Sequence, residues 1–297
     1  MPTKPLDIPP MRVDHVSIAV PDLEEALGFF RRHFPVVMRT EKRPGYTPDF
    51  FWCDFYVGNF VFELIEPRGS GSFVERFLAR RGPGLHHWSL EVERLDPYLE
   101  SLEREGLRIV DRFEAGPEIR TAFLSPRSAF GVLVQFWQVP KPALPERPEI
   151  AEFRLRSGET VRMRVDHVSL AVRDIERALG FFSRYFPFRL RREPHLSWDR
   201  TFSIASFYVN GYKVELVSPL PGRRSFLDRF LERRGEGFHH VSIDIDRLDP
   251  YVAELEAAGV RVVDRAELPG GVKTAFLSPR SAFGVLVQLW QGPEFRS

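Results

Sequence analysis

Cysteine is almost absent from this chain of 297 residues. Its one cysteine, Cys53, excludes an internal disulfide and a metal site built from clustered thiolates, so packing is the role predicted for it. No apolar run approaches the roughly 20 residues needed to cross a bilayer, and the opening MPTKPLDIPP has no apolar signal core. We therefore expect a cytoplasmic protein with no membrane partner.

An excess of charge of one sign is also lacking. The 42 basic residues are balanced by 41 acidic residues, which leaves a formal net charge of +1. Because nucleic-acid recognition normally needs a basic face, we expect no nucleic-acid partner. With 43% hydrophobic and 28% charged residues, the chain has the composition of a globular protein, and its length allows two domains with cores of their own.

The chain contains two copies of one sequence. RVDHVSIAVPDLEEALGFF recurs as RVDHVSLAVRDIERALGFF, GLHHWSLEV recurs as GFHHVSIDI, and TAFLSPRSAFGVLVQ occurs twice. The copied segments begin at Arg12 and Arg164, at Gly84 and Gly237, and at Thr121 and Thr274. Such self-similarity indicates a tandem duplication.

The duplication predicts an N-terminal domain of residues 1–139 and a C-terminal domain of residues 164–297. Between them, residues 140–163 begin with a charged stretch rich in proline, which is typical of a linker. The second part of this segment is expected to form a hairpin around Ser157 and Gly158.

Each half also contains two similar units. The strand-like DHVSIAV at residues 14–20 has the same shape as HHWSLEV at residues 86–92, and a helical pattern follows each of them, from Asp22 and from Asp96. Strand-like runs come after each helix. The unit is therefore a strand, a helix and several strands, and the chain holds four such units.

Alternation along the strands predicts where chemistry is concentrated. Successive side chains of a strand face opposite sides, so Val16 and Ile18 face a helix while His15 and Ser17 face the other way. By the same reasoning each unit offers one histidine from its first strand and one oxygen donor from its last strand. We predict that these donors meet in two quartets: His15, Glu63, His87 and Gln135 in the first half, and His167, Glu215, His240 and Gln288 in the second.

Two imidazoles, a carboxylate and an amide oxygen are donors that suit a borderline divalent cation such as Fe, Mn, Co, Ni or Zn. A single histidine on a strand is more often a packed residue than a ligand. A buried glutamate that faces inward is nevertheless costly without a cation or another partner. The expected cofactor is therefore a divalent metal in each half.

These motifs resemble those of the vicinal oxygen chelate superfamily, which includes the glyoxalases, bleomycin resistance proteins and dioxygenases. DHVSIAV, VFELIEP, GLHHWSLEV and TAFLSPRSAFGVLVQ carry the resemblance, and their order is most similar to that of methylmalonyl-CoA epimerases. The resemblance covers nearly all of both halves. It implies an α+β fold with four βαβββ modules in two tandem glyoxalase-like domains, each with a cupped sheet, and metal ligands at the quartet positions.

The donor set departs from the epimerase pattern, in which an acidic residue usually occupies the last strand. Here Gln135 and Gln288 stand there, and the carboxylates are at Glu63 and Glu215. Four protein ligands on an octahedral ion leave two positions for a bidentate substrate, which favours Lewis-acid chemistry. We therefore expect an isomerase, epimerase or lyase that acts on a small oxo-acid or acyl thioester through an enolate-type intermediate.

Further residues have expected roles at this site. Glu63 and Glu215 are the predicted catalytic bases, with the strand residues Glu91 and Asp244 as alternatives. The SPRS loops carry Arg127 and Arg280, whose guanidinium groups are expected to bind a carboxylate or phosphate of the substrate, unless they are only surface turns. The aromatic residues at 50–56 and 198–208 form either a pocket wall or part of the core.

Two other functions stay open on the sequence alone. If the glutamines are not ligands, two histidines and one glutamate match the iron site of non-haem Fe(II) oxygenases, and the chain resembles 4-hydroxyphenylpyruvate or extradiol dioxygenases. Alternatively, the protein binds a small molecule without turnover, as resistance proteins of the superfamily do. A monomer and a homodimer are both compatible with the sequence, because two joined halves can complete the pairing that shorter relatives achieve by dimerising.

Overall fold

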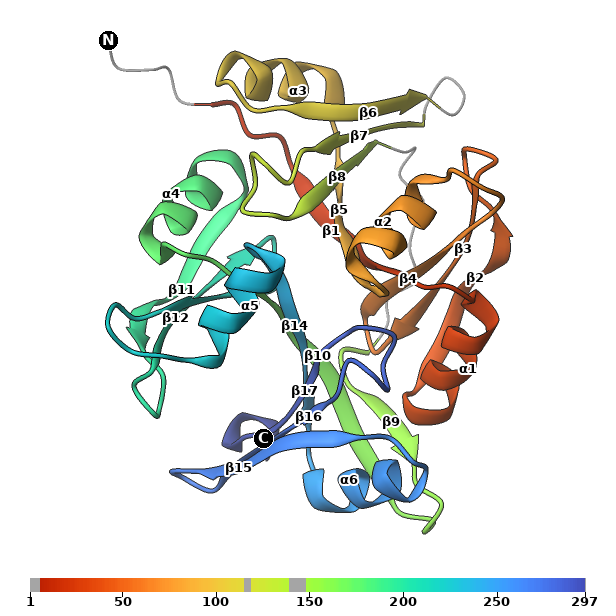
Figure 1. The fold of residues 1–297 in the computed structure, drawn as a ribbon, viewed down its shortest axis with the longest axis vertical. Coiled ribbons are helices and arrows are strands. Elements are labelled where there is room, and N and C mark those ends of the chain that lie inside the picture. Colours follow the sequence, from red (N-terminus) through yellow and green to blue (C-terminus); the bar gives the residue numbers. More distant parts are fainter. Residues whose placement is uncertain (1–5, 115–118, 139–147, 297) are drawn as a thin grey trace. The chain divides into compact units, whose positions relative to one another are not determined.

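The computed structural model describes residues 6–114, 119–138 and 148–296 (Figure 1). The first half holds two modules with the predicted order of elements. They comprise β1 (Met11–Ala19), α1 (Leu23–His33), β2 (Val36–Pro44), β3 (Phe50–Val57), β4 (Phe60–Pro67) and α2 (Phe73–Arg81), then β5 (Gly84–Val92), α3 (Leu95–Arg104), β6 (Ile109–Glu114), β7 (Arg120–Leu124) and β8 (Leu133–Gln138).

The second half repeats these modules after one additional strand. Its elements are β9 (Ala151–Arg154), β10 (Thr160–Ala171), α4 (Ile175–Tyr185), β11 (Phe188–Leu196), β12 (Phe202–Val209), β13 (Tyr212–Pro219), α5 (Phe226–Arg234), β14 (Gly237–Ile245), α6 (Leu248–Ala257), β15 (Val262–Leu268), β16 (Val272–Leu277), β17 (Val287–Gln291) and the 3-10 helix η1 (Pro293–Arg296). The predicted α+β fold of four βαβββ modules is confirmed.

Each half contributes one mixed sheet. The first has eight strands in the order β2-β3-β4-β1-β5-β8-β7-β6, and the second has β11-β12-β13-β10-β14-β17-β16-β15. In both sheets the first and last strands of a module are parallel neighbours, whereas the other strands of the module pair antiparallel. Parallel neighbours set the side chains of the first and last strands on a common face, which decides the geometry of the site.

The ninth strand of the second sheet, β9, pairs antiparallel with the start of β10, from Thr160 opposite Arg154 to Met163 opposite Ala151. The turn contains Ser157 and Gly158, so the predicted hairpin is confirmed. The proline-rich part of the predicted linker lies mostly outside the described residues. The boundaries of the two domains at residues 139 and 164 therefore stay a prediction.

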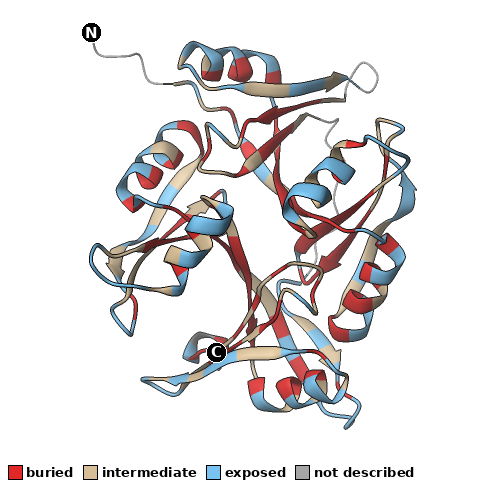
Figure 2. Cartoon of the chain, viewed as in Figure 1, coloured by how far each residue is buried: buried red, intermediate tan, exposed pale blue. Residues whose placement is uncertain are grey.

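Helices α1, α3 and α4 pack their apolar faces against the side of the sheet opposite the predicted donors, whereas α2 and α5 pack against Ala19 and Ala171 on the other side. Helix α1 begins where the Asp22 side chain accepts a hydrogen bond from the Glu25 backbone N–H, as the sequence predicts. Its buried residues include Leu27 and Phe30, and the Phe30 ring lies 5.4 Å from the ring of Phe55 on β3. Figure 2 shows the same division in the other helices, with buried residues toward the sheet and exposed residues away from it. Within the described residues, every helix is too short or too polar to cross a membrane.

Contacts divide the chain into two compact units that do not follow the halves of the sequence. Unit 1 comprises Met1–Asp14, His87–Ala143 and Val168–His239, and unit 2 comprises His15–His86, Leu144–His167 and His240–Ser297. Each unit thus combines most of one module of the first half with most of one module of the second, and the divisions between units fall inside β1, β5, β10 and β14.

One hydrogen bond occurs in both units between residues that are equivalent in the two copies of the sequence. In unit 1, the Tyr98 hydroxyl donates a hydrogen bond to the carbonyl oxygen of Tyr185. In unit 2, the hydroxyl of Tyr251, the repeat of Tyr98, donates to the carbonyl oxygen of His33, the repeat of Tyr185, at 2.6 Å. This is the reciprocal pattern of an isologous contact, in which residue i of one copy meets j of the other and j meets i.

Cys53 is buried in strand β3, as the sequence predicts, and burial raises the pKa of its thiol to about 12. Because the thiolate is the reactive form, the native protein is expected to react with a thiol reagent at pH 8 roughly a thousandfold more slowly than the unfolded chain. The measurement is the rate of labelling by an aromatic disulfide, with and without denaturant. A native rate close to the denatured rate contradicts the burial of this residue.

Candidate metal centres

The registers of the parallel strand pairs place the predicted donors on one face of each sheet. Ser17 of β1 pairs with Glu63 of β4, and Ser89 of β5 pairs with Gln135 of β8. The histidines at 15 and 87 precede these serines by two residues, so they share their face. In the second sheet Ser169 pairs with Glu215 and Ser242 pairs with Gln288, which repeats the arrangement.

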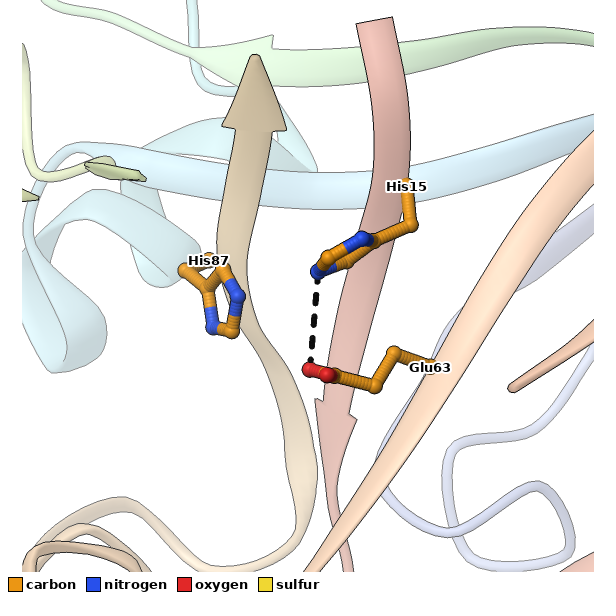
Figure 3. A group of neighbouring side chains, drawn as sticks. All are labelled: His15, Glu63 and His87. Carbon is orange, nitrogen blue, oxygen red and sulfur yellow. Dashed lines mark ion pairs between the residues drawn. The ribbon is translucent and has the colours of Figure 1, made fainter. Parts of the chain in front are cut away.

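The first donor group consists of His15, Glu63 and His87, whose possible ligand atoms all lie within 4.8 Å of one another. All three residues are buried, and Nε2 of His15 lies 3.5 Å from Oε2 of Glu63. Figure 3 shows the two imidazoles and the carboxylate pointing toward a common point from different strands. Convergence of a buried carboxylate on two imidazoles is the expected arrangement for a divalent cation.

The second donor group consists of His167, Glu215 and His240, again with ligand atoms within 4.8 Å of one another. The two imidazole rings are 5.4 Å apart, and Ser169 donates a hydrogen bond to the Glu215 carboxylate at 3.2 Å. Nδ1 of His167 lies 2.6 Å from the carboxylate of Asp166. A carboxylate on one ring nitrogen fixes the tautomer that leaves the other nitrogen available as a metal ligand.

The glutamines lie on the same face, each on the strand beside a histidine strand. Oε1 of Gln135 is buried and accepts no hydrogen bond from any residue within the described ranges. A buried amide oxygen without a donor is unfavourable, and a cation would satisfy it. The residues present therefore fit a divalent metal, with His15, Glu63, His87 and Gln135 to hold it in the first half. The equivalent Gln288 is half-buried, and the role of both glutamines as ligands stays a prediction.

The first histidine of each HH pair is a core residue instead of a donor. The His86 ring contacts Phe77 at 4.7 Å, and its repeat His239 contacts Phe230 at 4.9 Å. Burial lowers the pKa of each to about 4. Both imidazoles are therefore neutral near pH 7 and serve packing.

The alternative bases, Glu91 and Asp244, are engaged with arginines. Nε of Arg12 donates to the Glu91 carboxylate at 2.9 Å, and Arg164 donates twice to Asp244 at 3.1 Å. A carboxylate that is held by an arginine is less available to contact a substrate. The role of Glu63 and Glu215 as catalytic bases stays a prediction.

Arg127 and Arg280 are exposed on the turns that follow β7 and β16. Neither residue belongs to a donor group, and their role in substrate binding stays a prediction. The aromatic residues divide between the two expected roles. Phe55 and Phe207 are completely buried under helices, whereas Trp198 is 66% exposed.

One acidic residue of the first site was missed. Asp54 of β3 is the register partner of Glu63, is buried, and lies 3.4 Å from Nη1 of Arg39. Alternation from Trp52 through Asp54 to Tyr56 places it on the donor face. It was overlooked because the aromatic residues around it dominate this stretch of sequence.

Comparison with known families agrees with this geometry. The model of the glyoxalase/bleomycin resistance protein/dioxygenase superfamily matches residues 14–123 and residues 166–276, which together make up most of both halves. The chain belongs to this superfamily. Both matches include the first histidine and the glutamate of their half, so the two copies are both members of the superfamily.

Individual relatives within the superfamily match one half of the chain at a time. The uncharacterized protein YqjC of Bacillus subtilis is 32% identical over 129 residues, which are 42% of this chain and 89% of that protein. Human mitochondrial methylmalonyl-CoA epimerase is 30% identical over 131 residues, 43% of this chain and 73% of that enzyme. The ethylmalonyl-CoA/methylmalonyl-CoA epimerase of Cereibacter sphaeroides is 33% identical over 137 residues, 43% of this chain and 98% of that enzyme.

A solved structure matches almost the whole chain. It is a mutant of 4-hydroxymandelate synthase from Streptomyces coelicolor, with a TM-score of 0.63 and 15% sequence identity over 96% of this chain and 93% of that one. At this identity the match shows a common fold of four modules.

Proposed function

We propose that this protein is a divalent-metal-dependent enzyme that moves a proton next to a carbonyl group of a small oxo-acid or acyl thioester. The reaction is that of an epimerase, isomerase or lyase. The observation that carries the proposal is the convergence of two imidazoles and a carboxylate in each half, with a glutamine on the same face. Relatives named as methylmalonyl-CoA epimerases, 30–33% identical to one half, support an acyl thioester as substrate.

Each residue has a distinct task in this proposal. A metal held by His15, Glu63, His87 and Gln135 would supply Lewis acidity toward a carbonyl oxygen. Glu63 is proposed to accept the proton from the carbon next to that carbonyl and to return it there, and an epimerisation requires in addition a second acid that delivers a proton to the opposite face. In the second half Glu215 has the same task, among His167, His240 and Gln288.

The sheet and the loops supply the remaining conditions of the reaction. Burial of the donor group keeps bulk water away from the reacting carbon and strengthens the electrostatic interactions there. Arg127 and Arg280 are proposed to bind an anionic group of the substrate from the turns. The chemistry therefore uses one carboxylate in each half, Glu63, which is buried, and Glu215, which is half-buried.

The test is exchange of the proton next to the carbonyl for deuterium. Protein purified without chelator is incubated in D2O with methylmalonyl-CoA, with another acyl thioester and with small 2-oxo acids, and the substrates are followed by NMR. We expect exchange with at least one of them, loss of exchange after chelation, and recovery on addition of metal. Exchange that is unaffected by removal of the metal, or no exchange with any substrate, contradicts the proposal.

One observation favours a second candidate function. The three donors that the structure brings together in each half are two histidines and one carboxylate, which is the facial triad of non-haem Fe(II) oxygenases. If the glutamines are not ligands, we expect the Fe(II)-loaded protein to consume oxygen with aromatic 2-oxo acids. An oxygen electrode measures this directly. A binding protein without turnover would show neither deuterium exchange nor oxygen uptake.

A further inference from the structure

The two halves differ on the face of the sheet that carries the donors. At three positions the change makes the second half more positive. Val37, Val61 and Asp54 of the first half are replaced by Arg189, Lys213 and Ser206, each 152 residues later. Each exchange adds one positive charge or removes one negative charge. The positions lie on β2, β3 and β4 of the first half and on β11, β12 and β13 of the second, and β4 and β13 also carry Glu63 and Glu215.

In the second half these changes gather cations around one tyrosine. Tyr208 is the register partner of Lys213, and the guanidinium of Arg189 lies 4.4 Å from the centroid of the Tyr208 ring. Nε of Arg191 donates a hydrogen bond to the Tyr208 hydroxyl at 3.0 Å. We name Arg189, Arg191 and Lys213 the basic cluster.

The basic cluster adjoins the second donor group. Lys213 precedes Glu215 by two residues on β13, and register pairs both with residues of β12 on the same face. Because Glu215 belongs to the donor group, a ligand bound there can extend toward Lys213 along one side of the sheet.

The equivalent positions of the first half, all of them within the described residues, do not form such a cluster. Arg39, the repeat of Arg191, lies 3.4 Å from the carboxylate of Asp54, whereas the second half has Ser206 in place of that aspartate. Tyr56, the repeat of Tyr208, has Val37 and Val61 as register partners. The first half thus has an acidic residue beside Arg39 and two valines beside Tyr56, whereas the second half has arginines and a lysine around Tyr208.

We propose that the basic cluster binds an oxyanion group, a phosphate ester or a second carboxylate, of the ligand that enters the second half, and that the first half takes a ligand without this group. Three neighbouring cations repel one another, and an anion with several oxygens relieves that repulsion and accepts charge-assisted hydrogen bonds from all three. The two copies are therefore selective for ligands of different charge. The inference depends on the proposed function only in using the same face of the sheet.

The probes are inorganic phosphate, malonate and, as a monoanion, acetate, each titrated calorimetrically into the metal-loaded and the metal-free protein. In the metal-free protein we expect one phosphate or malonate per chain and weaker binding of acetate. Tighter binding of phosphate identifies a phosphate ester as the natural group, and tighter binding of malonate identifies a carboxylate. Two equivalent sites per chain, or binding only in the presence of metal, overturn the proposal.

The variants place residues of one half at the equivalent positions of the other half. Arg189→Val together with Lys213→Val introduces the residues that the first half already has, and should weaken phosphate and malonate about a hundredfold, since each lost charge-assisted contact costs about tenfold. Arg112→Val together with Arg265→Val, which removes two arginines paired with Glu103 and Glu256, is the control of equal charge and should leave the affinity within about twofold. Unchanged affinity in the double variant overturns the proposal.

A reciprocal variant keeps the test decisive if the double variant fails to fold. Val37→Arg, Val61→Lys and Asp54→Ser together build the cluster in the first half and should add a second phosphate per chain. A stoichiometry that stays at one contradicts the inference. Metal content measured on the same samples separates this outcome from a failure of the donor groups, because the proposed function requires bound metal and the basic cluster does not.

Discussion

Replacing His87 by alanine is expected to reduce the metal content of the protein from about two ions per chain to about one. The imidazole is one of three buried donors within 4.8 Å of one another. Loss of a hydrogen-bonding partner behind a ligand already lowers metal affinity by about 10- to 100-fold, so loss of the ligand itself should exceed 100-fold in the first half. Elemental analysis after dialysis, followed by a metal titration, measures both quantities.

The duplication supplies the matched control. His240→Ala removes the repeat of His87 and should empty the second donor group while the first stays loaded. The double variant should bind no metal and show no deuterium exchange. His86→Leu, which changes the neighbouring core histidine, should leave the metal content unchanged. Full metal content in the His87 variant would show that these donors do not form the site.

Gly131→Ala is expected to destabilise the protein by about 2–5 kcal/mol. Gly131 has φ of +78°, a left-handed conformation that costs other residues about 1–2 kcal/mol. A Cβ at this position would lie 1.7 Å from the carbonyl oxygen of Glu236, so backbone must also shift, at a cost of about 1–3 kcal/mol. The turn leads into β8, which carries Gln135, so the metal affinity of the first half should fall as well.

Gly106→Ala separates the two causes. Gly106 has a similar φ of +82°, but no atom lies within 4 Å of the place where its Cβ would stand. This variant should lose only about 1–2 kcal/mol. Urea denaturation compares the two, and Gly284→Ala, whose Cβ would lie 1.7 Å from the carbonyl oxygen of Pro83, should behave as Gly131→Ala does. If both variants lose the same free energy of unfolding, crowding by the Glu236 carbonyl is not the reason for the large effect at Gly131.

The donor face could be predicted from sequence because strand alternation is local. His15 and Ser17 share a face whatever the strand pairs with, and the repeat in the second half shows which residues are retained. The meeting of His15 with Glu63 also follows from the module, since its first and last strands are parallel neighbours. Local pattern and module order together therefore give three of the four predicted donors in each half.

Contacts between distant segments could not be predicted. The sequence around Tyr98 does not indicate that its hydroxyl donates a hydrogen bond to the carbonyl oxygen of Tyr185. Nor does the sequence indicate that Arg12 donates a hydrogen bond to the carboxylate of Glu91, because such contacts depend on how whole modules pack. The basic cluster was also missed, although comparison of the halves at a spacing of 152 residues contains the signal. The donors lie at positions that both copies retain, whereas the basic cluster lies at positions where the two copies differ, such as Val61 and Lys213.

The two compact units indicate that the two halves of the chain stay together even when the chain is cut. Each unit contains strands from before and after the linker, as the hydrogen bond from Tyr251 to His33 illustrates. A protein cleaved once between residues 138 and 148 would consequently persist as a noncovalent heterodimer. Covalent connection of the two halves in one chain raises their effective concentration and makes assembly independent of dilution.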